Sequence, residues 1–246
     1  MLIKTEGIVI KLMDYGESNK IITLYTPRYG KISVMAKGAK KPKSRFHGVT
    51  QLLTYGEYVL FMGQQMGNLN HGEIEHHFVD IKKNIEKTAY AAYMAELIDR
   101  IQEAKEANPY LFKQFLSGLE QINSGKDEEM VAMMFEMKLL QTAGYRPHLH
   151  SCAICGNREN LNYFSIQHGG IICSLHQEQE SYLLDPGTVK VLKMFEQIDI
   201  QRLGNINVKS ATRSQLKTIM KAFFDRHIGI SLKSRHFIEQ MKNLND

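Results

Sequence analysis

The sequence has no tryptophan, and only 5 prolines and 3 cysteines among its 246 residues. This low proline content, with 18 glycines, excludes collagen-like and low-complexity chains. The longest apolar run, at 89–95, has seven residues, whereas a membrane helix needs roughly 18. Glu6 stands where a signal peptide would continue its apolar segment. We therefore expect a soluble, cytoplasmic, globular protein with no membrane partner.

Charge of one sign is missing from two successive segments near the N-terminus. Residues 28–45 contain seven lysines and arginines and no acid, whereas residues 48–80 contain four acids and no lysine or arginine. Residues 205–246 are basic again. Two separated basic segments favour an extended polyanion as partner, with cations for its phosphates and aromatic rings for its bases. The candidate DNA-binding residues are Arg28, Tyr29, Lys31, Lys37, Lys40, Lys41, Lys43, Arg45 and Phe46.

The apolar pattern changes near residue 80. Alternating apolar residues predict five strands within residues 1–80, separated by short turns that contain glycine. Five strands in a cationic segment favour a closed oligonucleotide-binding (OB) barrel, because closure leaves no exposed edge. From residue 81 onward the period is helical, and Asn108 followed by Pro109 is a typical helix start. The predicted fold class is α+β, with an OB-fold domain at 1–80 and a mostly helical domain at 81–246.

All three cysteines lie in one segment. Their pattern is Cys152-x2-Cys155-x17-Cys173, and His176 follows Cys173 after two intervening residues. Two such closely spaced pairs supply the four tetrahedral ligands of structural Zn²⁺. Four protein ligands leave no open coordination position for catalysis. We therefore predict one structural zinc ion in a zinc-finger module at about residues 146–180.

Two other histidines in this region are alternative fourth ligands, His150 and His168, although each is less well spaced. The alternatives to a metal site are buried free thiols, or one disulfide that leaves an odd cysteine.

Signatures of common enzymes are missing from the sequence. It contains no Gly-x4-Gly-Lys-Ser/Thr phosphate loop, no Gly-x-Gly-x2-Gly or His-Glu-x2-His motif, and no Gly-x-Ser-x-Gly turn. Glu73, Glu75 and His77 share one face of a predicted strand, where a solvated surface is the simpler explanation. A metal-dependent nuclease would need carboxylates around an open site, which the sequence does not offer. We expect a protein that is not an enzyme.

Besides the cysteine pairs, four segments are distinctive enough to compare with a known family: GIVIKLMDYGESNKIITLYTPRYGKISVMAKGAKKPKSR (7–45), AAYMAELIDR (91–100), NPYLF (108–112) and RLGN (202–205). Together they resemble the RecO family of bacterial DNA repair proteins along essentially the whole chain. The resemblance implies an N-terminal OB fold and a helical domain with a zinc module. Zinc-bearing members usually have cysteine at the position of His176, and histidine ligates zinc as well.

The same resemblance implies a non-enzymatic recombination mediator that binds single- and double-stranded DNA and anneals complementary strands. The implied partners are RecR, the acidic C-terminal tail of the single-strand-binding protein SSB and, indirectly, RecA. The family helps to load this recombinase onto SSB-covered DNA. The implied location is the cytoplasm, in association with the nucleoid.

A protein-interaction adaptor is the alternative function, with the acidic SSB tail as main ligand and DNA contact secondary. Apolar residues beside cations suit a peptide that is acidic and ends in apolar residues, although a core face flanked by solvated lysines has the same pattern. The residues in question are Ile219, Phe223 and Phe224 beside Lys217, Lys221 and Arg226.

Overall fold

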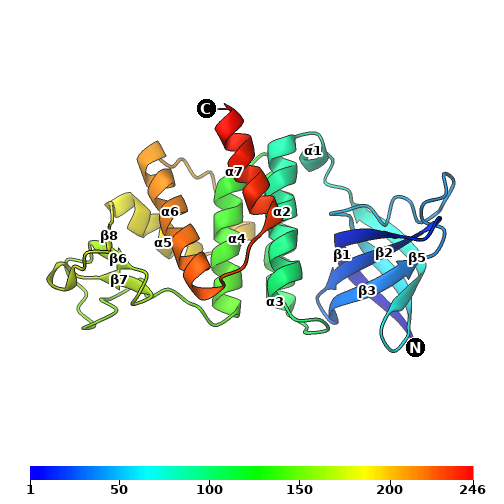
Figure 1. Ribbon diagram of the computed structural model, residues 1–246, viewed down its shortest axis with the longest axis horizontal. Helices are drawn as coiled ribbons and strands as arrows, with labels where there is room; N and C mark the ends of the chain where they lie inside the picture. Colours follow the sequence, from blue (N-terminus) through cyan, green and yellow to red (C-terminus); the bar gives the residue numbers. More distant parts are fainter. Residues whose placement is uncertain (246) are drawn as a thin grey trace. The chain divides into compact units, whose positions relative to one another are not determined.

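Figure 1 shows the computed structural model, which describes residues 1–245. The chain divides into two compact units. The first unit contains Met1–Glu128 and the segment from Leu232 onward, and the second contains Glu129–Ser231. Among the described residues, no helix has the length and apolar character needed to cross a membrane.

The first unit begins with a closed five-stranded barrel. Its strands are β1 (Leu2–Tyr15), β2 (Asn19–Thr26), β3 (Gly30–Ala36), β4 (Tyr55–Met62) and β5 (Gly67–His76). Their order around the barrel is β1-β2-β3-β5-β4, and only the β3–β5 pair is parallel. This closed barrel, followed by helices, confirms the predicted α+β fold class with an N-terminal OB fold.

The alternation of the strands explains the barrel core. On β2 and β3, Ile22, Leu24, Ile32 and Val34 are buried inside, and the residues between them face outward. Gly30 begins β3 with a φ of +60°, and a Cβ atom there would lie 2.2 Å from the carbonyl oxygen of Glu106. Only glycine therefore fits this turn.

Residues 37–54 connect β3 to β4 through consecutive turns. Ala39, Phe46, Val49 and Leu53 of this connection are buried, and all but Leu53 pack within the barrel core cluster. Burial of these side chains holds the connection against the barrel while its polar residues remain outside.

Helices complete the first unit: α1 (Val79–Lys82), α2 (Ile85–Ile101), α3 (Pro109–Asn123) and α7 (Lys233–Asn245). The Asn108 side chain accepts a hydrogen bond from Leu111 N, which confirms the predicted helix start. The Glu96 carboxylate of α2 accepts hydrogen bonds from Lys233 N and Ser234 N, so α2 caps the start of α7.

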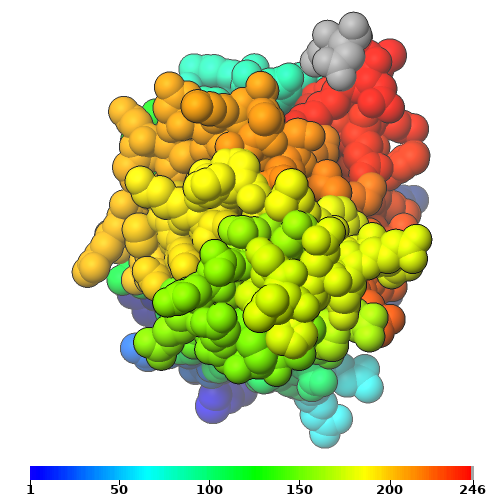
Figure 2. Space-filling view, turned by 90° about the vertical axis from the view of Figure 1, so that its left-hand side faces the viewer, coloured from blue at the N-terminus to red at the C-terminus, as the bar shows by residue number. Residues whose placement is uncertain are grey.

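The second unit contains most of α4 (Glu128–Thr142), followed by the cysteine segment and two longer helices. The cysteine segment includes β6 (Tyr163–Ser165), β7 (Gly170–Ile172) and the short 3-10 helix η1 (Ser174–His176). It is followed by β8 (Tyr182–Leu183), α5 (Pro186–Gln197), η2 (Ile200–Arg202) and α6 (Ser210–His227). Figure 2 views this unit, with the cysteine segment in yellow-green and α6 in orange.

The predicted division at residue 80 follows the change from strands to helices along the chain. The two compact units are defined by contacts between residues instead, and these contacts group α1, α2, α3 and α7 with the barrel.

Candidate metal centre and nucleic-acid interface

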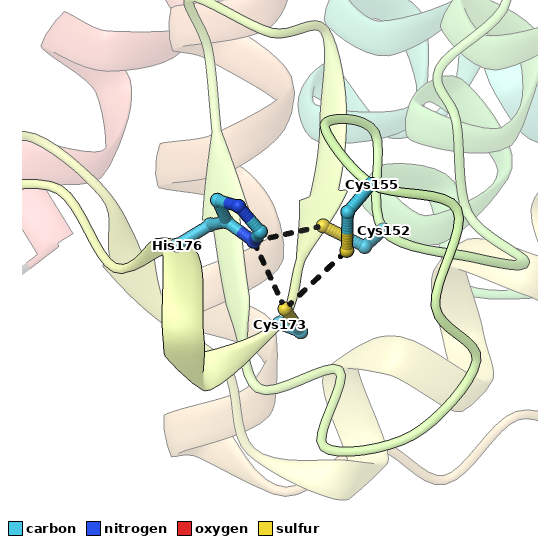
Figure 3. Close-up of side chains that lie close together, drawn as sticks. All are labelled: Cys152, Cys155, Cys173 and His176. Atoms are coloured by element: carbon cyan, nitrogen blue, oxygen red, sulfur yellow. Dashed lines mark hydrogen bonds between the residues drawn. The ribbon is translucent and has the colours of Figure 1, made fainter.

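Three cysteines and one histidine converge on one point (Figure 3). Cys152 and Cys155 lie on the turn before β6, while Cys173 precedes η1 and His176 ends it. Gly156, with a φ of +74°, closes the first turn, and its N–H donates to the carbonyl of Cys152 at 2.9 Å. The four ligand atoms all lie within 4.8 Å of one another.

These distances fit a tetrahedral zinc site. Bond lengths of about 2.3 Å for Zn–S and about 2.0 Å for Zn–N place tetrahedral ligand atoms about 3.5–3.8 Å apart. The distance between Cys155 Sγ and Cys173 Sγ is 3.9 Å. His176 Nδ1 lies 3.9 Å from Cys152 Sγ and 3.3 Å from Cys173 Sγ. The cluster can hold one metal ion, as the spacing of the ligands predicts.

The surroundings of Cys152 favour the thiolate form that a metal ligand requires. Burial opposes ionisation, but backbone N–H groups, led by those of Cys155 and Cys173, donate toward the sulfur and outweigh it. The net effect lowers the pKa of the Cys152 thiol to about 6.

The two alternative histidine ligands have other partners. His150 Nε2 lies 2.6 Å from Glu196 Oε2, and His168 Nε2 lies 2.8 Å from Glu178 Oε1. Both rings therefore bond to carboxylates, and His176 is the histidine of the cluster.

Five cations of the predicted DNA-binding set lie together on residues 37–45, which we call the basic loop. All five are exposed, namely Lys37, Lys40, Lys41, Lys43 and Arg45. Lys40 Nζ pairs with Asp14 Oδ2 at 3.0 Å, while the other three lysines have no ion pair within residues 1–245. The basic loop thus keeps several unneutralised positive charges at the surface.

Two residues of the predicted set contribute little to the surface. Phe46 is buried, so assigning it to a DNA interface was wrong, and Lys31 is half-buried. Phe46 is 7% exposed because it packs in the barrel core, with the Arg45 guanidinium 4.7 Å from its ring centroid. The Lys31 side chain is 12% exposed, and its Nζ donates to the carbonyl of Asp99 and pairs with the Asp99 carboxylate. The Phe46 ring is therefore not available to a nucleic acid, and the Lys31 ammonium is engaged by Asp99.

Arg28 and Tyr29 lie at the other end of β3, in the turn that joins it to β2. The seven residues of β3 separate this turn from the basic loop by about 20 Å. Arg28 is exposed, but it lines a depression of about 410 Å³ together with Glu6, Glu57 and Glu75. Tyr29 is half-buried against the barrel core. The predicted cations therefore do not form one continuous patch.

The outward-facing apolar residues of the barrel were not predicted from the sequence. Met13 of β1 and Phe61 of β4 are exposed by 55% and 52%. Tyr15 of β1 is also exposed, by 52%, whereas Tyr25 of β2 is fully buried. An apolar residue at an outward position of an alternating strand is the signal that could have identified this surface.

The fold and the cluster define an OB-fold protein with a helical part that carries a Cys₃His site of the metal-binding type. The chain belongs to the RecO family: residues 1–78 match "Recombination protein O N terminal" and residues 82–236 match "Recombination protein O C terminal". It is 42% identical over 243 residues to the DNA repair protein RecO of Bacillus mycoides (strain KBAB4), covering 98% of each chain. The DNA repair protein RecO of Bacillus cereus (strain AH187) has the same identity and coverage.

Proposed function

We propose that the protein is a DNA repair and recombination mediator that binds single- and double-stranded DNA with its barrel and does not cut it. The observation that carries the proposal is the basic loop, where Lys37, Lys41 and Lys43 are exposed and have no ion pair in the described part of the chain. The relatives' name, DNA repair protein RecO, points to the same process.

Strand annealing follows from the same charges. Repulsion between phosphates opposes the approach of two complementary strands, and cations near both backbones reduce it. The mediator then helps to load RecA onto SSB-covered DNA, with RecR as a further partner, as the family resemblance implies. The reaction needs no catalytic group of the protein.

The Cys₃His cluster would hold one structural Zn²⁺. Its thiolates and imidazole would occupy all four tetrahedral positions, so the ion would have no site for substrate. These residues would join the two turns around β6 and β7, a segment with a very small apolar core of its own.

Salt dependence tests the DNA-binding proposal. With about four to six phosphate contacts, log K for single strands should fall against log salt with a slope of about −3 to −4. Alanine at Lys37, Lys41 and Lys43 together should weaken binding to all sequences alike and reduce the slope by about 2.

A matched control removes three lysines from the helical part of the same unit, at Lys83, Lys113 and Lys126. This control should keep the affinity and slope of the unchanged protein. A slope near zero, or equal losses in both triple variants, would contradict the proposed site. Labelled DNA incubated with Mg²⁺ should remain uncut.

The adaptor function is the second candidate. Its peptide ligand would bind at a different place from the one predicted from the sequence. Ile219, Phe223 and Phe224 are buried, so the apolar face of α6 predicted to receive a peptide belongs to the core. A groove of about 810 Å³ lies beside α5 instead. Its lining combines apolar and basic side chains, including Val191, Met194, Ile198, Ile206, Lys190, Lys193 and Lys209.

This groove suits an acidic peptide with apolar ends, such as the SSB tail. A fluorescent tail peptide should bind the unchanged protein and lose affinity on Lys190→Glu with Lys193→Glu, while DNA affinity persists. If these variants lose DNA instead of peptide, the groove is not the peptide site.

A further inference from the structure

Cys155 is the solvent-facing cysteine of the Cys₃His cluster. It is exposed, whereas Cys152 and Cys173 are only 2% and 1% exposed. The space beside it is open as well: apart from its chain neighbours, no atom of residues 1–245 lies within 4 Å of the place where a Cβ atom of Gly156 would stand. The oxidation of a cysteine depends on its exposure. A small oxidant in solution therefore reaches Cys155 before the other two sulfurs.

A second sulfur lies within reach of Cys155. In Figure 3 a dashed line joins the sulfurs of Cys155 and Cys173, whose Sγ atoms are 3.9 Å apart. A disulfide bond is about 2.0 Å long, so these two atoms would have to approach each other by about 2 Å. Cys155 lies in a turn and is followed by a glycine of positive φ, whereas Cys173 packs in the small core with Ile172. The movement therefore belongs to Cys155.

Cys152, in the same turn as Cys155, is the alternative disulfide partner. Backbone N–H groups of Cys155, Cys173 and Ile154 donate to its sulfur. Hydrogen bonds to a charged acceptor are about twice as strong as bonds to a neutral one, and a disulfide would remove that charge. A bond between Cys155 and Cys173 leaves the Cys152 sulfur unchanged. The geometry thus favours Cys173 as the partner.

We propose that Cys155 is an oxidative modification site, at which hydrogen peroxide forms a sulfenic acid that Cys173 converts to a disulfide. In the first step the Cys155 thiolate attacks the peroxide, an S–O bond forms, the O–O bond breaks and hydroxide leaves. In the second step the Cys173 thiolate attacks the Cys155 sulfur, the S–S bond forms, the S–O bond breaks and a second hydroxide leaves. The two sulfurs lose two electrons, and the peroxide gains them.

The modification goes beyond the proposed function and rests on it only for the fate of the metal. The disulfide would leave Cys152 and His176 as ligands, whereas structural zinc uses four. The ion would therefore be released. The new bond would still join the two turns that the metal joins, and a thiol reductant would restore the original cluster.

Mass spectrometry distinguishes the two possible disulfides. Trypsin cuts after lysine and arginine but not before proline, so Cys152 and Cys155 share the peptide 139–158, while Cys173 lies in the peptide 159–190. The full-length protein is treated with hydrogen peroxide, its free thiols are blocked, and it is digested without reductant. The two peptides should be joined, with the block on Cys152. A chromogenic chelator should detect zinc release over the same time course.

Two variants that each keep four ligands form a matched pair. Cys155→His should lose both the joined peptides and the peroxide-dependent release of zinc. Cys152→His removes a buried sulfur instead and should still give the joined peptides. A thiol reductant should reverse the effect in the unchanged protein. Oxidised methionines are not restored in this way, because they need their own reductases.

Three outcomes would overturn the inference. The disulfide could form within the peptide 139–158, the peroxide could oxidise Cys152 or Cys173 before Cys155, or Cys155→His could release zinc as fast as the unchanged protein. Failure of the proposed metal site looks different, since the purified protein would then contain no zinc before the peroxide is added. The joined peptides would still test the modification of Cys155 in that case.

Discussion

Glu196 is a buried carboxylate that connects α5 to the segment before the cysteines. Its side chain is 1% exposed, and it pairs with Arg146 Nε at 2.7 Å and with His150 Nε2 at 2.6 Å. Its backbone carbonyl accepts a hydrogen bond from the buried Lys138 Nζ at 2.9 Å. Burial alone would raise the pKa of the Glu196 carboxyl, but the hydrogen bonds from His150 and Arg146 outweigh it and lower the pKa.

Glu196→Gln should reduce the free energy of unfolding by about 1–3 kcal/mol at neutral pH. A lowered pKa means that the ionised carboxylate stabilises the fold above its ordinary pKa of 4.5, and that this stabilisation is lost as the pH falls through the lowered value. Urea unfolding of both proteins at several pH values measures the difference. It should be constant above pH 4.5 and shrink below it; a difference that grows in acid would contradict this account.

Phe46 and Phe61 are a buried and an exposed phenylalanine of the barrel domain, so their alanine variants form a matched pair. Phe46→Ala should cost about 3–5 kcal/mol of unfolding free energy because it empties a core position, whereas Phe61→Ala should cost less than about 0.5 kcal/mol. Folded Phe46→Ala should keep its DNA affinity, because the buried ring cannot contact a ligand. Urea unfolding and anisotropy measure the two effects. A stable Phe46→Ala protein would show that its ring is not part of the core.

If the Cys₃His cluster holds the proposed zinc ion, the folding of the cysteine segment should depend on it. Purified protein should contain about one zinc ion per chain by elemental analysis. A strong chelator should lower the melting temperature of the second unit, because metal binding contributes to its folding. His176→Cys keeps four ligands and should retain zinc, whereas His176→Ala should lose it. Equal metal content in both variants would exclude His176 as a ligand.

The outer face of β1, β4 and β5 carries a row of like charges. Glu6 lies opposite Glu57, and Glu57 opposite Glu73. Lys4 Nζ pairs with Glu57 Oε1 at 2.6 Å, and Tyr55 donates to Glu6 at 2.7 Å, whereas the Glu73 carboxylate has no hydrogen bond or ion pair within residues 1–245. Like charges directly opposite on a sheet destabilise it.

Glu73→Gln should therefore raise the free energy of unfolding by about 0.2–1 kcal/mol. The gain should diminish in high salt because exposed charges are screened. Glu103→Gln, which neutralises an exposed glutamate outside the barrel, is the control and should have little effect on urea unfolding. If the increase in unfolding free energy persisted in high salt, it would not be due to the removal of charge repulsion.

Across the molecule, local patterns in the sequence were enough to predict the barrel and the cluster of three cysteines and one histidine. Alternation and glycine turns predict the strands, and two short spacings bring Cys152, Cys155, Cys173 and His176 together. The helix start at Asn108 is equally local, since its side chain accepts from an N–H only three residues away.

Features set by contacts between distant residues could not be predicted in this way. Lys31 is taken out of the basic surface by Asp99, 68 residues further along the chain. Phe46 is buried because its connection folds back over the barrel. Phe223 and Ile219 have the same sequence pattern whether they form a groove or a core, and only packing decides.

The position of α7 has a consequence for how the chain is made. The chain emerges from the ribosome N-terminus first. Helix α2 therefore emerges long before α7, the helix that packs against it. Glu96 meets its partner Ser234 only after 137 intervening residues have been translated. The second unit is a continuous segment and can fold in the meantime. A premature stop codon near the end of the message would thus leave the early half of the molecule incomplete, and would expose it to degradation by cellular proteases.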